Sequence, residues 1–164
     1  MRPLRHALLV STALAAACGS EARPFDARVF VGTWRGLWTD DMGRSGRVVL
    51  TVTDEGDALQ LACDVLGPSL PGIFPATEHV VAKIRGGEAV IEEHRSRTFG
   101  AVRGAVAADG RLAIMCDGVA GPAGSLHAMG TWTGQCLIVE VDVTYDGSLR
   151  TNQAHVELRR RGRD

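Results

Sequence analysis

Residues 30–38 read Phe-Val-Gly-Thr-Trp-Arg-Gly-Leu-Trp, and the folded part of the chain is expected to begin with this stretch. It holds two of the three Trp of the chain, Trp34 and Trp38, beside two Gly. In an extended strand, two residues that lie four positions apart point to the same side. The stretch therefore predicts a strand with both indoles on one face, where Trp34 is a core residue and Trp38 could line a cavity.

The rest of the chain is predicted to continue as short strands separated by turns. Residues 47–53 alternate, with Val48, Leu50 and Val52 on one face. Asp-Gly or Gly-Gly pairs, which are typical of hairpin turns, stand between several such segments, and no segment keeps a helical period. The strands are expected at residues 29–39, 47–53, 59–63, 78–85, 88–94, 99–107, 111–116, 125–133, 136–145 and 151–160. This pattern predicts an all-β fold, an antiparallel up-and-down β-barrel of eight to ten strands, because closure removes exposed sheet edges.

The opening strand supports this fold through a family resemblance. Residues 30–34, Phe-Val-Gly-Thr-Trp, resemble the first strand of the calycin families, the lipocalins and fatty-acid-binding proteins, which share a Gly-x-Trp there. The resemblance implies that Trp34 plugs the closed end of a barrel and that Gly32 lets the chain turn beneath it. It also implies that an Arg of the last strand packs over the indole. Arg159 or Arg160 could do so, and we assign this role to Arg159.

A calycin-like barrel suggests a ligand cavity, whose candidate lining residues are Trp38, Leu61 and Trp132. Small residues at would-be inward positions leave room for an apolar guest, but they also suit a narrow, fully packed barrel. These residues are Ala62, Ala82, Ala101, Ala105, Ala113 and Ala128. The leading expectation is binding of a small apolar or amphipathic ligand. The alternative is a packed barrel that binds a protein, for example an inhibitor of an envelope hydrolase, through loops 67–75 and 118–124.

Residues 1–17 are expected to be a secretory signal peptide, with an Arg-bearing start, an apolar run over residues 7–14 and three Ala at the end. Residues 14–18 resemble the lipobox of bacterial lipoproteins, although Ala15 stands where the family usually has Leu. The resemblance implies a lipid anchor on Cys18; the alternative is ordinary cleavage after Ala17. We therefore expect an exported protein, periplasmic or an outer-membrane lipoprotein, with a tether over residues 18–28, one barrel domain over 29–161 and a tail over 162–164.

The body contains three further Cys, and an internal echo suggests which two are paired. Residues 59–64 (Leu-Gln-Leu-Ala-Cys-Asp) and 112–117 (Leu-Ala-Ile-Met-Cys-Asp) are alike, which would put Cys63 and Cys116 in equivalent places and suggests a disulfide between them. The alternative is that hairpins of similar length reuse similar residues. Disulfides are compatible with an exported protein.

Chemistry other than binding finds little support. The His residues are scattered, and the one dense acid–His cluster, residues 92–94 (Glu-Glu-His), is expected to be a solvated strand with Glu92 and His94 on one face. No Cys-x-x-Cys, Gly-x-Ser-x-Gly or phosphate-loop motif occurs, so we assign no catalytic residues, no metal and no cofactor. Without the signal peptide the chain carries 16 Lys and Arg against 19 Asp and Glu, which gives no reason to expect nucleic-acid binding.

Overall fold

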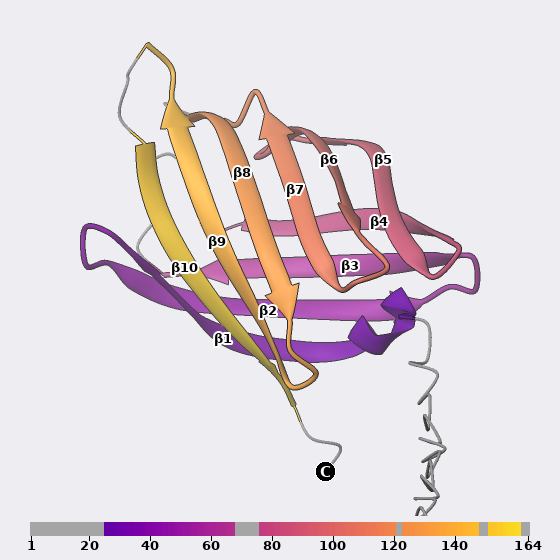
Figure 1. Ribbon diagram of the computed structural model, residues 1–164. Coiled ribbons are helices and arrows are strands. Elements are labelled where there is room, and N and C mark those ends of the chain that lie inside the picture. Colours follow the sequence, from indigo (N-terminus) through magenta and orange to yellow (C-terminus); the bar gives the residue numbers. More distant parts are fainter. Residues whose placement is uncertain (1–24, 68–75, 121–122, 148–150, 162–164) are drawn as a thin grey trace, which may run out of the picture.

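The computed structural model describes residues 25–67, 76–120, 123–147 and 151–161 of the protein. Ten antiparallel strands close into a barrel in which each strand pairs with the next along the chain and β10 returns to pair with β1 (Figure 1). The prediction of an all-β, up-and-down antiparallel barrel is confirmed. The strands are β1 (Gly32–Asp40), β2 (Ser45–Asp54), β3 (Ala58–Leu66), β4 (Ala76–Arg85), β5 (Glu88–Ser96), β6 (Gly100–Val106), β7 (Arg111–Asp117), β8 (Ala123–Trp132), β9 (Cys136–Tyr145) and β10 (Thr151–Arg160).

Alternation of side chains decides which face of each strand is inside. In β1, Trp34 and Trp38 are both buried, whereas Leu37 between them is exposed. The β4–β5 turn illustrates how the hairpins are made, because Gly86 and Gly87 both have positive φ (59° and 89°). A two-residue hairpin turn of this type favours glycine, since other residues are strained at such angles.

A short 3₁₀ helix, η1 (Ala27–Phe30), closes one end of the barrel (Figure 1). Asp26 caps it by accepting a hydrogen bond from the Arg28 backbone N–H at 2.9 Å. The backbone N–H of Ala27 donates to the carbonyl of Gly87 at 2.8 Å, which fastens the helix to the β4–β5 turn. We call this end the plug end. Residues 25–28, which the sequence assigned to a tether, pack against it, and residues 29–30 are helical rather than part of the first strand.

The opposite end, which includes the β1–β2 and β5–β6 turns, we call the mouth. In the described ranges, no helix has the length and apolar character needed to span a bilayer. The predicted signal peptide, the lipid anchor at Cys18 and the tail over residues 162–164 lie outside the described residues.

Candidate functional site

The plug end is packed with aromatic rings. Trp34 is 1% exposed, and its indole Nε1–H donates to the carbonyl oxygen of Phe30 at 2.7 Å. The rings of Phe30 and Trp34 lie 5.9 Å apart between centroids, and Phe25 meets the ring of Trp132 at 5.8 Å in an edge-on arrangement. Such pairs stabilise a structure beyond the area that they bury. Trp34 therefore lies at the closed end of the barrel, where the calycin resemblance placed it.

The Arg that covers Trp34 is Arg160, so the assignment of this role to Arg159 was wrong. The guanidinium carbon of Arg160 lies 5.8 Å from the indole centroid of Trp34. Arg159 points outward and donates to Glu157 Oε1 at 2.9 Å. The reason is strand register, because Arg160 pairs with Trp34 across the β1–β10 ladder while Arg159 pairs with the exposed Arg35.

Gly32 makes room for this contact. Its φ is +131°, and a Cβ on it would lie 3.2 Å from the Nε of Arg160. A larger residue would push the guanidinium away from Trp34. Gly32, Trp34 and Arg160 are thus one packing unit at the plug end.

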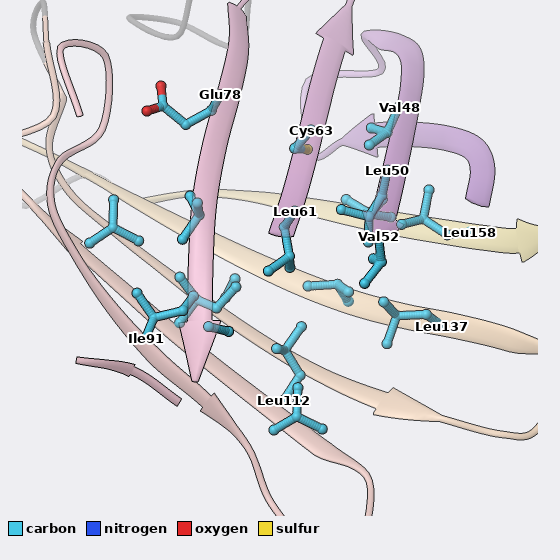
Figure 2. Close-up of a pocket in the computed structure, with 18 of the residues that line it drawn as sticks. Val48, Leu50, Val52, Leu61, Cys63, Glu78, Ile91, Leu112, Leu137 and Leu158 are labelled. Carbon is cyan, nitrogen blue, oxygen red and sulfur yellow. The ribbon is translucent and has the colours of Figure 1, made fainter. Parts of the chain in front are cut away.

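Above the plug the barrel is hollow. A cavity of about 270 Å³ lies among inward side chains from all ten strands (Figure 2). The sequence named three candidate lining residues, and the structure places Trp38 and Leu61 in the cavity wall. Trp132 is not part of the lining but packs with Phe25 and Phe30 at the plug end.

The small residues divide in the same way. Ala82, Ala105 and Ala128 border the cavity. The other three candidates do not border it, and this part of the expectation was wrong. They are Ala62, Ala101 and Ala113. Ala113 is exposed because it alternates with Leu112 and Ile114, which take the inward positions of β7.

The lining is apolar except toward the mouth. Glu78 of β4 is the one charged residue of the described chain that lines the cavity, and it pairs with Cys63 across the β3–β4 ladder. Figure 2 shows Glu78 toward one end of the group of lining side chains, on the strand beside that of Cys63. Glu78 is not among the site residues predicted from the sequence, although its two-residue spacing from Val80 and Ala82 marks it as inward.

Cys63 and Cys116 both line the cavity as free thiols, so the suggested disulfide is not formed. They stand on β3 and β7, with three strands between them in the barrel order. Burial, helped by the charges of Asp64 and Glu78, raises the pKa of Cys63 to about 11. Burial and the charges of Asp117 and Glu78 raise the pKa of Cys116 to about 12. Both are therefore protonated, weakly polar wall residues at neutral pH.

His94 reaches the mouth because of a β-bulge in β5. Opposite β6, Ile91 pairs with Gly104 and His94 with Val102, so that Glu92 and Glu93 together face Arg103. The extra residue turns His94 to the side of Ile91 and leaves Glu92 outside, where it pairs with Lys83 at 2.9 Å. The expectation that Glu92 and His94 share a face was wrong.

Glu78 and His94 meet where the barrel wall is split. The β4–β5 ladder consists of Lys83–Val90, Ile84–Ala89 and Arg85–Glu88, all near the turn at the plug end. From there toward the mouth the two strands lack backbone pairing within their described residues. His94 Nε2 lies 3.2 Å from Glu78 Oε1, so this side-chain contact bridges the split. The Glu78 and His94 side chains are 15% and 29% exposed.

The described part of the chain offers no other chemistry at this site. It contains no group of three or more His, Cys, Asp or Glu that could hold a metal ion. Two protonated thiols, a carboxylate and an imidazole at the rim of an apolar space form a surface suited to binding.

Comparison with known proteins shows similarity at the level of the fold. No family model and no curated protein sequence matches the chain. Among solved structures, Rv2717c from M. tuberculosis superposes with a TM-score of 0.60 at 12% identity, over 82% of this chain and 94% of that one. A protein of unknown function from the DUF3598 family of Nostoc punctiforme gives 0.61 at 14% identity, over 84% of this chain and 50% of that one, so this chain spans about half of its length. The S-type phycobiliprotein lyase CPES from Guillardia theta gives 0.52 at 8% identity, over 84% and 91%. Together with the closed ten-stranded topology, these similarities show that the chain has a calycin-like β-barrel fold.

Proposed function

We propose that the protein binds one small, mainly apolar ligand inside the barrel. The observation that carries this proposal is the cavity of about 270 Å³, walled by Val, Leu, Ile and aromatic side chains from every strand. Apolar ligand sites in proteins are concave, largely preformed spaces with a few polar groups at defined positions. The cavity has this character, with its polar groups toward the mouth.

The loss of stability that an unfilled cavity causes supports the proposal that a ligand occupies it. Empty apolar space destabilises a protein by roughly 24 cal/mol per Å³. For the cavity of about 270 Å³ this is on the order of 6 kcal/mol, comparable with the whole stability of a small domain, about 5–15 kcal/mol. Larger side chains at Ala82 or Ala128 would have removed this cost, so a guest that fills the space accounts for the small residues there.

The volume limits the size of the guest. A cavity needs roughly 10–15 Å³ to hold one water molecule, so a cavity of about 270 Å³ has room for a guest of many heavy atoms. A chain of eight or nine carbon atoms fits this space. The packed-barrel alternative requires a filled interior, which the cavity argues against. In its two proposed contact loops, residues 68–75 and 121–122 lie outside the described residues.

We further propose that the barrel works outside the cytoplasm, lipid-anchored through Cys18. The support is the signal-like composition of residues 1–17 and the lipobox-like residues 14–18. Mass spectrometry of the protein purified from a bacterial expression host should find a diacylglycerol-modified Cys18 at its N-terminus. An unmodified N-terminus at Met1 would overturn both export and anchoring, and an unmodified N-terminus at Cys18 would overturn the anchor alone.

A titration with n-octanol tests the binding function. Trp38 lines the cavity and is 1% exposed, so its fluorescence reports on the guest. We expect a saturable change in Trp fluorescence with one octanol bound per chain. In Trp38→Phe this fluorescence change should be lost, while calorimetry should still detect octanol binding. Absence of saturable binding by calorimetry, of n-octanol as well as of the amine and the carboxylate with the same chain length, would overturn the proposed function.

A further inference from the structure

We infer that the ligand is amphipathic and carries a protonated amine head group, which Glu78 binds at the mouth while the apolar part fills the barrel. This inference rests on the proposed ligand-binding function and names the chemical class of the ligand. It assigns to Glu78 the role of specificity-determining residue.

The hydrogen bonding of the Glu78 carboxylate is incomplete among the described residues. Its two oxygens offer about four acceptor positions. Among the described residues only His94 Nε2, 3.2 Å from Oε1, bonds to it, and the side chain is 15% exposed. A carboxylate so largely withdrawn from water is costly without donors. The ammonium group of an amine has three donors and a positive charge, and it fits the free positions of Glu78.

Glu78 lies between the apolar interior and solvent. It stands at the split between β4 and β5, beyond the last backbone pair of the β4–β5 ladder, and His94 faces it from β5. A head group placed there meets the carboxylate and keeps part of its hydration. A chain attached to it would enter the cavity along Cys63 and Leu61, which line the wall on the neighbouring strand β3.

An anionic head group would bind poorly at this site. Among the described residues no Lys or Arg lines the cavity, so an acidic ligand would find no cation along the wall. The two nearby thiols are neutral, because burial raises the pKa of Cys63 to about 11 and that of Cys116 to about 12. A carboxylate head group would therefore face the like charge of Glu78, which costs affinity.

Three ligands with the same chain length separate these alternatives. Calorimetry of the full-length protein with n-octylammonium, n-octanol and octanoate, at low salt and below micelle formation, compares head groups at constant apolar volume. We expect n-octylammonium to bind about tenfold more tightly than n-octanol, the effect of one charge-assisted hydrogen bond, and octanoate to bind most weakly. This comparison needs no variant and decides the inference even if substitutions prevent folding.

Two variants then locate the effect. Glu78→Gln should weaken n-octylammonium binding about tenfold, to the level of n-octanol, and leave n-octanol binding unchanged. Glu92→Gln, a control on the outer face of β5, should change neither. If n-octanol binds and n-octylammonium binds no better, or if Glu78→Gln keeps the amine preference, the inference is overturned and the proposed function stands. If none of the three ligands binds, both are overturned.

Discussion

The two ends of the barrel are formed by the same ten strands but are packed in opposite ways. At the plug end Phe25, Phe30, Trp34 and Trp132 fill the space between the strands, and Arg160 covers the indole of Trp34. Toward the mouth the same ten strands enclose a cavity, and the β4–β5 ladder is interrupted. One sheet thus carries a dense end and a hollow end.

The difference shows how a small barrel can keep a cavity without losing its fold. Aromatic burial at the plug end is the largest local source of stability, since each such side chain buries about 150–250 Å². That end holds the strand register while the rest of the barrel stays hollow. We therefore expect equal substitutions to have unequal effects at the two ends.

The largest effect is expected from removing one phenyl ring at the plug end. Phe30→Ala should lower the free energy of unfolding of the ligand-free protein by about 3–5 kcal/mol, because Phe30 is 5% exposed and packs against two Trp. Phe99→Ala, in the β5–β6 turn at the mouth, should cost less than half as much, since Phe99 is only partly buried, whereas Phe30 belongs to the buried core. Urea denaturation measures both values. Equal losses would contradict the division into a packed end and a hollow end.

The second effect is chemical and concerns the mouth. Folding raises the pKa of Cys63 from 9.0 to about 11, by burial first and then by the charges of Asp64 and Glu78. A shift of two pH units makes the thiolate fraction at pH 8 about a hundredfold smaller than in the unfolded chain, and Cys116 is shifted at least as far. Because folding raises both pKa values, the folded state holds these two protons more tightly than the unfolded chain does. The free energy of unfolding is therefore unaffected by this titration below pH 9, and it falls as the pH rises from 9 toward about 11.

Alkylation by iodoacetamide at pH 8, followed by peptide mass spectrometry, tests this directly. Cys63 and Cys116 should react at least about a hundredfold more slowly in the folded protein than in urea. Peptide mapping separates them from Cys18 and Cys136. Rapid modification of Cys63 in the folded protein would show that the mouth is wetter than the cavity lining indicates.

The sequence made the dense end more predictable than the hollow end. Gly32 and Trp34 indicate the strand that closes the barrel. The alternation of apolar and polar residues within 47–53 and 136–145 is strong enough to assign those strands. The Arg over the indole was missed by one position, because which of two adjacent Arg points inward depends on the β1–β10 register. Register is a tertiary property that a run of polar residues does not encode.

At the mouth the missing information was of another kind. A bulge between Ile91 and His94 reverses the direction of every later side chain in β5, and alternation alone cannot reveal an inserted residue. The echo around Cys63 and Cys116 suggested a bridge, yet the barrel order separates their strands. The presence of a cavity could not be foreseen either, since small inward residues are compatible with a filled or a hollow barrel.

A third prediction fills the hollow end. Ala128 is 7% exposed and borders the cavity, so Ala128→Leu should place three more carbon atoms in empty space. At about 0.8 kcal/mol per buried methylene, stability should rise by up to about 2 kcal/mol, and n-octanol binding should weaken at least about tenfold. Thermal unfolding and calorimetry measure the two effects. Ala113→Leu on the outer face of β7 is the control and should change neither; a loss of stability in Ala128→Leu would mean that the space is not free.

The smallest effect concerns the cation over the plug. Arg160→Met keeps much of the length of the side chain but removes the charge over Trp34 and the hydrogen bond that Arg160 donates to the carbonyl oxygen of Val31. It should lower the free energy of unfolding by about 1 kcal/mol, the scale of a cation–π contact and a hydrogen bond at an exposed site. Arg159→Met is the matched control on the opposite face of the same strand. It loses only a contact with Glu157 on the barrel surface, which contributes little, so its unfolding curve should stay within about 0.5 kcal/mol of the unmodified protein. If the two substitutions have the same effect, the indole at the plug end is held by burial and by the carbonyl of Phe30 without help from the last strand.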